Sequence, residues 1–225
     1  MPRNKRPGGN NALQKTGAGA AGAGRNEVRI IAGTWRGRKI RFPPAAGLRP
    51  TPDRVRETLF NWLAPSIGGA RCLDLFAGSG ALGLEALSRG AAHVVFVEKS
   101  PAIAQHLSVV TTLLAPGRAE VAARDARRWL AGTPRDFDIA FVDPPFGAGL
   151  LDEALAALAR PGWLAAGALA YIECPAATGE PALPGGWRLH RSGRAGEVGY
   201  HLAAVAGSVA DGGGQEPGGS PGERE

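Results

Sequence analysis

Short aliphatic segments alternate with helical segments over residues 71–173, and this alternation limits the possible folds most. The expected strands are 71–75, 93–97, 119–123, 139–142 and 169–173, and the expected helices are about 80–89, 101–114, 125–131 and 149–160. Strands that are separated by helices form βαβ units, in which parallel strands are covered on both faces. After Trp187 two strand-like segments follow without a helix, which indicates a terminal antiparallel hairpin. The pattern predicts an α/β fold with a mostly parallel sheet and helices on both faces.

A glycine-rich segment, CLDLFAGSGALGLEAL, follows the first expected strand. Gly78, Gly80 and Gly83 match G-x-G-x-x-G, a pattern that lets the backbone approach a ligand at a helix N-terminus. Nicotinamide and flavin enzymes share the pattern. Asp74 at the end of the strand would repel a pyrophosphate but would accept a hydrogen bond from an ammonium group. S-Adenosylmethionine carries an ammonium and a sulfonium and has no phosphate, so Asp74 favours this cofactor.

Further acids follow the other strands, at the sheet edge where open α/β sheets bind ligands. Glu98 ends the second strand, where its carboxylate can accept from two ribose hydroxyls. Asp125 follows the third strand, where it or a neighbouring amide can meet an adenine edge. For each acid alone, a helix-capping or loop role is an equally open alternative.

The fourth strand ends at a stiff acidic corner, FVDPPFGAG. Pro144 and Pro145 have fixed φ angles and no N–H group, so they continue neither a helix nor a central strand. The Asp143 carboxylate and the Pro144 carbonyl can together accept hydrogen bonds from both N–H groups of an exocyclic amine. Phe146 can stack on a base that is turned out of its helix or loop. The corner indicates methylation of an amine, with either Asp143 or water taking the released proton.

Positive charge is concentrated at the front of the chain. Residues 1–56 hold thirteen Lys and Arg against Glu27 and Asp53, whereas the whole chain has a net charge of +6. This asymmetry favours a polyanionic partner, and a solvated basic face is the alternative. Residues 28–42 read as two short strands around a glycine-containing turn. Such a hairpin would offer phosphates and a base five side chains: Trp35, Arg36, Arg38, Lys39 and Arg41. A hairpin that packs on the domain with its charges in water is the alternative.

A helix is expected over residues 50–64. Thr51 suits the N-cap, Pro52 the first helical position and Asp53 the positive end of the helix. The loop that leads into it consists of Arg49, Pro50 and Thr51. Polar groups at a helix N-terminus favour an anionic ligand group.

The two ends are poor in large apolar residues, so residues 1–26 and 207–225 are expected to be disordered tails. The folded domain is then 27–206, divided into a hairpin at 27–45, the helix at 50–64 and the core at 70–206. Cys72 and Cys174 lie in apolar stretches, which is typical of a reduced cytoplasmic protein and argues against a thiol nucleophile. The four histidines lack metal-ligand spacing, and no apolar run is long enough to span a bilayer.

Four longer segments carry a closer resemblance: VRIIAGTWRGRKI, GLRPTPDRVRETLFNWL, CLDLFAGSGALGLEALSRGAA and FVDPPF. They resemble the RsmD family of bacterial 16S ribosomal RNA guanine-N2 methyltransferases, within the class I S-adenosylmethionine-dependent methyltransferases. The resemblance covers about residues 27–205. It implies a Rossmann-like sheet of seven strands with a small N-terminal hairpin extension. It also implies methylation of the exocyclic N2 of one guanine in 16S rRNA, within an assembled or partly assembled small ribosomal subunit.

The resemblance also implies roles for individual residues. The cofactor would be lined by Asp74, Phe76, Gly78 and Gly80, with Glu98 at the ribose and with Asp125 and Ala126 beside the adenine. Its methionine end would be covered by Arg49, Pro50 and Thr51. The target base would be held by Asp143, Pro144, Pro145 and Phe146. The segment around Asp125 matches the family only loosely, and the two tails have no counterpart in it.

Several alternatives stay open at this point. An adenine-N6 enzyme on nucleic acid and a glutamine-N5 enzyme on protein would use the same acidic corner. A non-catalytic RNA-binding assembly factor could keep the cofactor fold, although Asp74, Glu98 and Asp143 together argue against this. A nicotinamide dehydrogenase is weakened by Asp74. A monomer without a metal ion is expected.

Overall fold

The computed structural model describes residues 26–44, 51–147 and 149–206. The expected tails therefore lie outside the described residues, apart from Asn26, and so do Arg49 and Pro50 of the predicted cofactor site. The helices are α1 (Asp53–Trp62), α2 (Ala81–Ser88), α3 (Pro101–Leu114), α4 (Ala126–Leu130) and α5 (Leu150–Leu158), with a short 3-10 turn at Ala176–Thr178. The strands are β1 (Glu27–Arg29), β2 (Lys39–Arg41), β3 (Arg71–Asp74), β4 (His93–Glu98), β5 (Ala119–Ala123), β6 (Phe137–Val142), β7 (Leu164–Pro175), β8 (Trp187–Ala195) and β9 (Val198–Val205).

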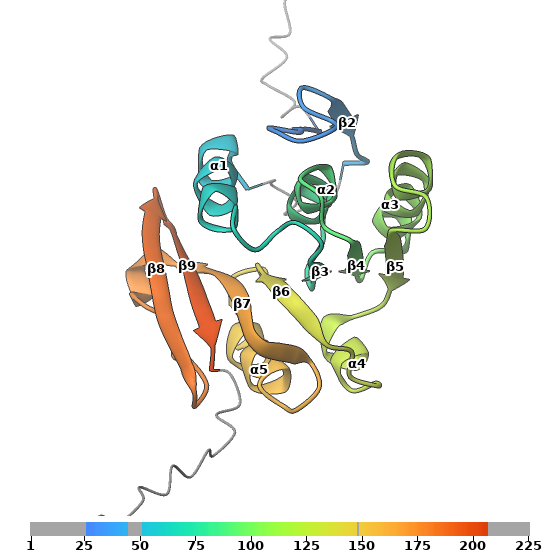
Figure 1. Cartoon of the computed structure of the whole chain (residues 1–225). Helices are drawn as coiled ribbons and strands as arrows, with labels where there is room; N and C mark the ends of the chain where they lie inside the picture. Colours follow the sequence, from blue (N-terminus) through green and yellow to red (C-terminus); the bar gives the residue numbers. More distant parts are fainter. Residues whose placement is uncertain (1–25, 45–50, 148, 207–225) are drawn as a thin grey trace, which may run out of the picture.

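The central sheet has seven strands in the order β5-β4-β3-β6-β7-β9-β8. The first five are parallel to one another, and β9 runs antiparallel between β7 and β8. Helices α1, α2 and α3 cover one face of the sheet, and α4 and α5 cover the other (Figure 1). The predicted α/β fold, with its terminal antiparallel hairpin, is confirmed. None of the described helices is long and apolar enough to cross a membrane.

Strand β7 is much longer than the sequence pattern indicates. It begins at Leu164 and ends at Pro175, whereas only residues 169–173 have a clear strand pattern. The added segment LAAGA is rich in Ala and Gly, which have low strand propensity. Leu164 pairs with Phe137 of β6, and a register shift before the next pair, Ile139 with Leu169, accommodates the added residues. At the other end, Cys174 and Pro175 continue the strand by pairing with β9.

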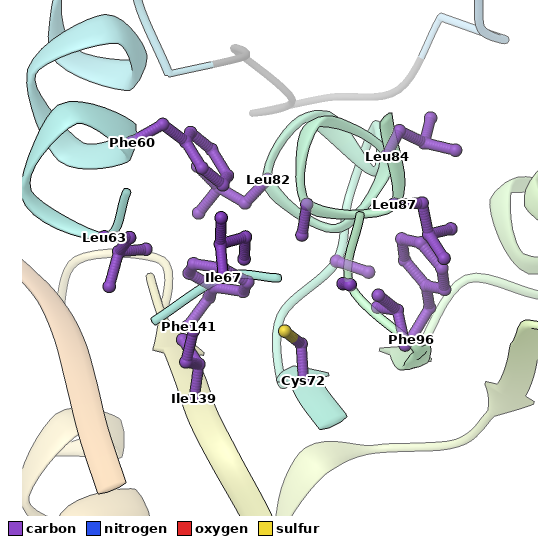
Figure 2. Close-up of a cluster of buried hydrophobic side chains, with 14 of the residues drawn as sticks. Phe60, Leu63, Ile67, Cys72, Leu82, Leu84, Leu87, Phe96, Ile139 and Phe141 are labelled. Carbon is purple, nitrogen blue, oxygen red and sulfur yellow. The ribbon is translucent and has the colours of Figure 1, made fainter. Parts of the chain in front are cut away.

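The core beneath α1 and α2 is built from alternate residues of the strands (Figure 2). Phe96 of β4 and Phe141 of β6 are fully buried there, together with Phe60 of α1. Gly83 allows α2 to lie close to the sheet, since a Cβ atom at this position would lie 2.2 Å from the Phe96 ring. Close approach of α2 places its N-terminus at the carboxyl ends of the central strands.

The N-terminal hairpin, β1 and β2, is attached to α1 and α2 by a buried polar network. The Glu85 carboxylate accepts hydrogen bonds from the Ile31 N–H at 2.8 Å and the Ala32 N–H at 3.0 Å. It also pairs with Arg89 at 2.7 Å and Arg56 at 3.5 Å, and the Glu85 and Arg56 side chains are both buried. The hairpin therefore has a fixed position over α2, at one end of the molecule (Figure 1).

Ser88 of α2 also fixes this hairpin, and its replacement tests the attachment. Its hydroxyl accepts from the Trp35 N–H at 3.0 Å and donates to the Ala32 carbonyl at 2.6 Å. Because Ser88→Ala leaves both backbone groups without this partner, we expect the free energy of unfolding to fall by about 1–3 kcal/mol. Denaturant unfolding measures the change. Ser108→Ala on the exposed face of α3 is the control, and equal effects of the two substitutions would contradict the attachment.

Candidate active site

Four acidic side chains stand in a row at the carboxyl ends of four neighbouring strands. Glu98 ends β4, Asp74 ends β3, Asp143 follows β6, and Glu173 lies near the end of β7. Successive side chains of a strand point to opposite faces of the sheet. Each acid comes two residues after a core residue beneath α1 and α2, in turn Phe96, Cys72, Phe141 and Tyr171. All four acids therefore project from the same face of the sheet.

Asp74 is the least exposed acid of the row. Its side chain is 3% exposed, and its Oδ2 atom accepts a hydrogen bond from the Gly83 N–H at 2.9 Å. Burial raises the pKa of Asp74 to about 7, with the charge of Glu98 adding to the rise and the Gly83 hydrogen bond opposing it. Among the described residues, no Lys or Arg forms an ion pair with Asp74. An ammonium group from a ligand would supply this missing charge.

Glu98 connects the glycine loop to the next helix. Its Oε2 atom accepts from the Gly78 N–H at 2.9 Å, and its Oε1 atom accepts from the Ser100 N–H at 2.7 Å. Gly78 and Gly80 have φ angles of +50° and +75°, which favour glycine. A carboxylate has about four lone-pair sites, so Glu98 keeps capacity for two ribose hydroxyls.

The acidic corner combines a shielded carboxylate with an exposed ring. Burial first, and then the charges of Glu173 and Asp74, hold the pKa of Asp143 well above its usual range. Pro144 is buried and Pro145 is exposed. Phe146 is 53% exposed, so its ring can contact a base. The predicted set of Asp143, Pro144, Pro145 and Phe146 thus offers two acceptors and an aromatic surface.

Glu173 belongs to the row but was not among the predicted site residues. It is 4% exposed, and its Oε1 atom accepts from the Tyr171 hydroxyl at 2.7 Å and from the Thr51 hydroxyl at 3.2 Å. Burial raises the pKa of Glu173, and these two hydrogen bonds oppose the rise. The sequence did contain a signal, because Glu173 ends the fifth expected strand as the other acids end theirs.

The prediction that Thr51 caps α1 is wrong. Helix α1 begins at Asp53, its N-cap is Pro52, and no side chain caps it. The Thr51 hydroxyl instead donates to Glu173, 122 residues away. A hydrogen bond to a buried carboxylate is stronger than one between neutral groups, which explains the preference. Asp53 lies in the first turn as predicted, and it pairs with Arg56 at 2.6 Å.

Phe76, predicted to line the cofactor, and Ala126, predicted with Asp125 to flank its adenine, lie toward the other face of the sheet. Phe76 and Ala126 line a pocket of about 360 Å³ beside α4 and α5, together with Arg127. Asp125 caps α4, since its Oδ1 atom accepts from the backbone N–H groups of Arg127 at 3.0 Å and Arg128 at 3.3 Å. Asp125 therefore has the helix-capping role that the sequence left open as an alternative. Of the two residues predicted to flank adenine, Ala126 lines the pocket.

The predicted RNA-binding residues of the hairpin differ in their surroundings. Arg36, Arg38 and Arg41 are exposed and form no ion pair within the described part of the chain. Lys39 pairs with Glu27 at 2.9 Å. Trp35 is half-buried against the core beneath α2, so part of its ring is already used in packing. The three exposed arginines are therefore better placed than Trp35 to contact RNA.

Neither cysteine is suited to nucleophilic catalysis, because burial raises the pKa of both the Cys72 and the Cys174 thiol. Within residues 26–44, 51–147 and 149–206, no three His, Cys, Asp or Glu side chains are grouped so that they could hold a metal ion.

The sheet order, the glycine loop and the acidic strand ends together define a Rossmann-like methyltransferase of class I. A sequence model of the family described as Conserved hypothetical protein 95 matches residues 28–204. The chain belongs to this family, the RsmD family, as its four sequence segments predicted.

Two relatives and two solved structures show how close the similarity is. The chain is 53% identical over 182 residues to Ribosomal RNA small subunit methyltransferase D of Escherichia coli K12, covering 80% of this chain and 91% of the relative. It is 43% identical to the Haemophilus influenzae protein of that name, covering 79% and 94%. The solved structure of Escherichia coli yhhF, described as a methyltransferase, has a TM-score of 0.76 and 49% identity, with 80% and 98% covered. Haemophilus influenzae HI0767, described as a methylase, has a TM-score of 0.68 and 40% identity, with 80% and 99% covered.

Proposed function

We propose that this protein transfers the methyl group of S-adenosylmethionine to the exocyclic N2 amine of one guanine in 16S rRNA. The substrate is the small ribosomal subunit or an intermediate of its assembly. The observation that carries the proposal is the corner at Asp143 and Pro144, beside three further carboxylates of the same sheet face. The relatives' name, Ribosomal RNA small subunit methyltransferase D, supports the RNA substrate. The choice of guanine N2 rests on the family.

The residues present fit the cofactor. S-Adenosylmethionine, when bound, supplies a methyl group on a positively charged sulfur. Asp74 offers its ammonium group a buried carboxylate that has no cation partner among the described residues. Glu98 has acceptor capacity for the ribose hydroxyls, and the pocket at Phe76 and Ala126 offers an apolar surface to the adenine.

The protein's own contribution is to hold and orient the amine. The lone pair of an exocyclic amine is delocalised into the ring, so the amine is a weak nucleophile. When Asp143 and the Pro144 carbonyl accept hydrogen bonds from its two N–H groups, the nitrogen is drawn toward tetrahedral geometry and its direction is fixed. Phe146 stacks on the base. The raised pKa of Asp143 suits it to take the proton that the amine releases.

The product identifies the reaction. We expect incubation with small subunits and cofactor to yield N2-methylguanosine, detected by mass spectrometry of the digested rRNA. N6-methyladenosine would indicate the adenine enzyme, and methylglutamine in protein would indicate the glutamine enzyme. RNA binding without measurable cofactor affinity would indicate an assembly factor. Each of these three results would contradict the proposal.

The basic hairpin is the proposed RNA contact. Its exposed arginines lie on an element that Glu85 and Ser88 hold in place, so the charge is presented at a defined position. We propose that the protein acts on the subunit as a monomer. Because assembling ribosomal subunits are the proposed substrate, we infer that the reaction takes place in the cytoplasm.

Charge reversal tests this contact. The variant has Arg36, Arg38 and Arg41 all replaced by Glu. We expect it to bind the subunit about 10-fold or more weakly near physiological salt, since three phosphate contacts are lost. The slope of log affinity against log salt should become shallower by about one for each arginine. Filter binding at several salt concentrations measures both quantities. The same reversal of Arg188, Arg191 and Arg194 on β8 is the matched control, and an equal loss in both variants would show a general charge effect instead.

A further inference from the structure

Glu173 lies beside the proposed amine-binding corner, yet the reaction described above does not use it. In the parallel pairing of β6 with β7, Phe141 is opposite Tyr171 and Val142 is opposite Ile172. The next pair in this register is Asp143 and Glu173. Paired residues of neighbouring strands point to the same face of the sheet, so the two carboxylates are neighbours at the edge where the base is proposed to bind.

The hydrogen bonds of Glu173 leave one of its oxygens available. Both hydroxyl donors, Tyr171 at 2.7 Å and Thr51 at 3.2 Å, bind the same atom, Oε1. The other oxygen, Oε2, has no hydrogen-bond partner among the described residues. Two donors on Oε1 fix the direction of the carboxylate and favour its ionised form, in which Oε2 is an acceptor. Glu173 is 4% exposed, so little water reaches this oxygen and a further donor would stabilise the carboxylate. A ligand group with an N–H would supply that donor.

The edges of guanine and adenine differ beside their amines. In guanine the N2 amine is adjacent to N1–H, which is a second donor. In adenine the N6 amine is adjacent to N1, which is an acceptor. A carboxylate oxygen next to the group that binds the amine therefore accepts from guanine and repels the lone pair of adenine. A buried acceptor left facing another acceptor is strongly disfavoured.

We propose that Glu173 determines base specificity: its free carboxylate oxygen accepts a hydrogen bond from N1–H of the guanine whose N2 amine Asp143 holds. Asp143 and Glu173 then read two adjacent donors of one base edge. The inference rests on the proposed function, because it requires the N2 amine to be the methyl acceptor.

The analogue 2,6-diaminopurine tests this role. It keeps the N2 amine but has an acceptor at N1. Small subunits are reconstituted with ligated 16S rRNA that carries guanine or 2,6-diaminopurine at the mapped target position, and kcat/KM is measured for both. We expect the wild-type protein to prefer guanine by about 100-fold or more, because the analogue leaves Glu173 unpaired. Equal kcat/KM for the two bases would overturn the proposal without any variant.

Glu173→Gln tests the residue itself. Its amide can donate to N1 of diaminopurine, so we expect the preference for guanine to fall by at least about 10-fold. Tyr171→Phe removes one donor to Oε1 but keeps the carboxylate, and the preference should stay within about 3-fold of the wild-type value. An equal loss of kcat/KM on both bases in Glu173→Gln would show a structural role and overturn the proposal. So would an unchanged preference accompanied by weaker cofactor binding in calorimetry. Failure of the proposed function is a separate result, in which the wild-type protein forms no N2-methylguanosine.

Discussion

Replacing Asp143 with asparagine is expected to slow methyl transfer by about 100-fold or more. Asparagine has nearly the same shape and its amide oxygen can still accept from the amine, but the side chain carries no negative charge and has only one acceptor oxygen. The amide of this variant would also be unable to take the released proton. Single-turnover transfer from labelled cofactor to small subunits measures the rate. Calorimetry should show a cofactor dissociation constant within about 3-fold of the wild-type value, since Asp143 is assigned to the base.

Asp136→Asn is the matched control for this prediction. Asp136 is exposed and lies just before β6, at the end of the strand opposite to Asp143. Its replacement makes the same chemical change away from the proposed site. We expect this variant to have wild-type activity. A near-normal rate in Asp143→Asn would refute the role of the corner, and a large loss of cofactor affinity would assign Asp143 to the cofactor instead.

Asp74→Asn is expected to weaken cofactor binding about 10- to 100-fold, because a hydrogen-bonded charge partner of the ammonium is lost. The neutral amide can still accept from the Gly83 N–H, so the glycine loop keeps its contact. Calorimetric titration with S-adenosylmethionine gives the dissociation constant. An unchanged dissociation constant would remove Asp74 from the cofactor site.

The pH dependence of binding gives a second test of Asp74. Its pKa of about 7 means that the carboxyl is increasingly protonated as the pH falls below 7. Since the ammonium binds the ionised form, cofactor affinity should decrease by up to about 10-fold for each pH unit between pH 6.5 and 5.5. Asp74→Asn should show a nearly flat profile over this range, because position 74 no longer titrates. A flat profile in the wild-type protein would contradict the assignment.

The sequence predicts the parallel sheet and the acidic strand ends well, because these features are local. Each strand is a short apolar run, and each acid ends its strand, as Asp74 does, or directly follows it, as Asp143 does. Acids that end neighbouring parallel strands necessarily meet at one edge of the sheet. Their common face is not evident from any single segment, since it depends on the pairing register of four strands.

The features that the sequence did not predict depend on contacts between distant residues. Thr51 has a good local pattern for an N-cap, but a carboxylate 122 residues away binds its hydroxyl. Arg56 belongs to a basic run, yet it is buried against Glu85 rather than free to bind a polyanion. In both cases a tertiary contact with a buried charge overrides a local preference, and only the folded arrangement reveals it.

The corner at Asp143 is proposed to hold the N2 amine of a guanine in the small subunit for methylation. The most direct test is transfer of a labelled methyl group by the wild-type and Asp143→Asn proteins to 30S subunits that lack the modification, followed by nucleoside analysis and mapping. We expect N2-methylguanosine at one position with the wild-type protein and about 100-fold slower formation with the variant. A different methylated nucleoside, or equal rates for the two proteins, would contradict it.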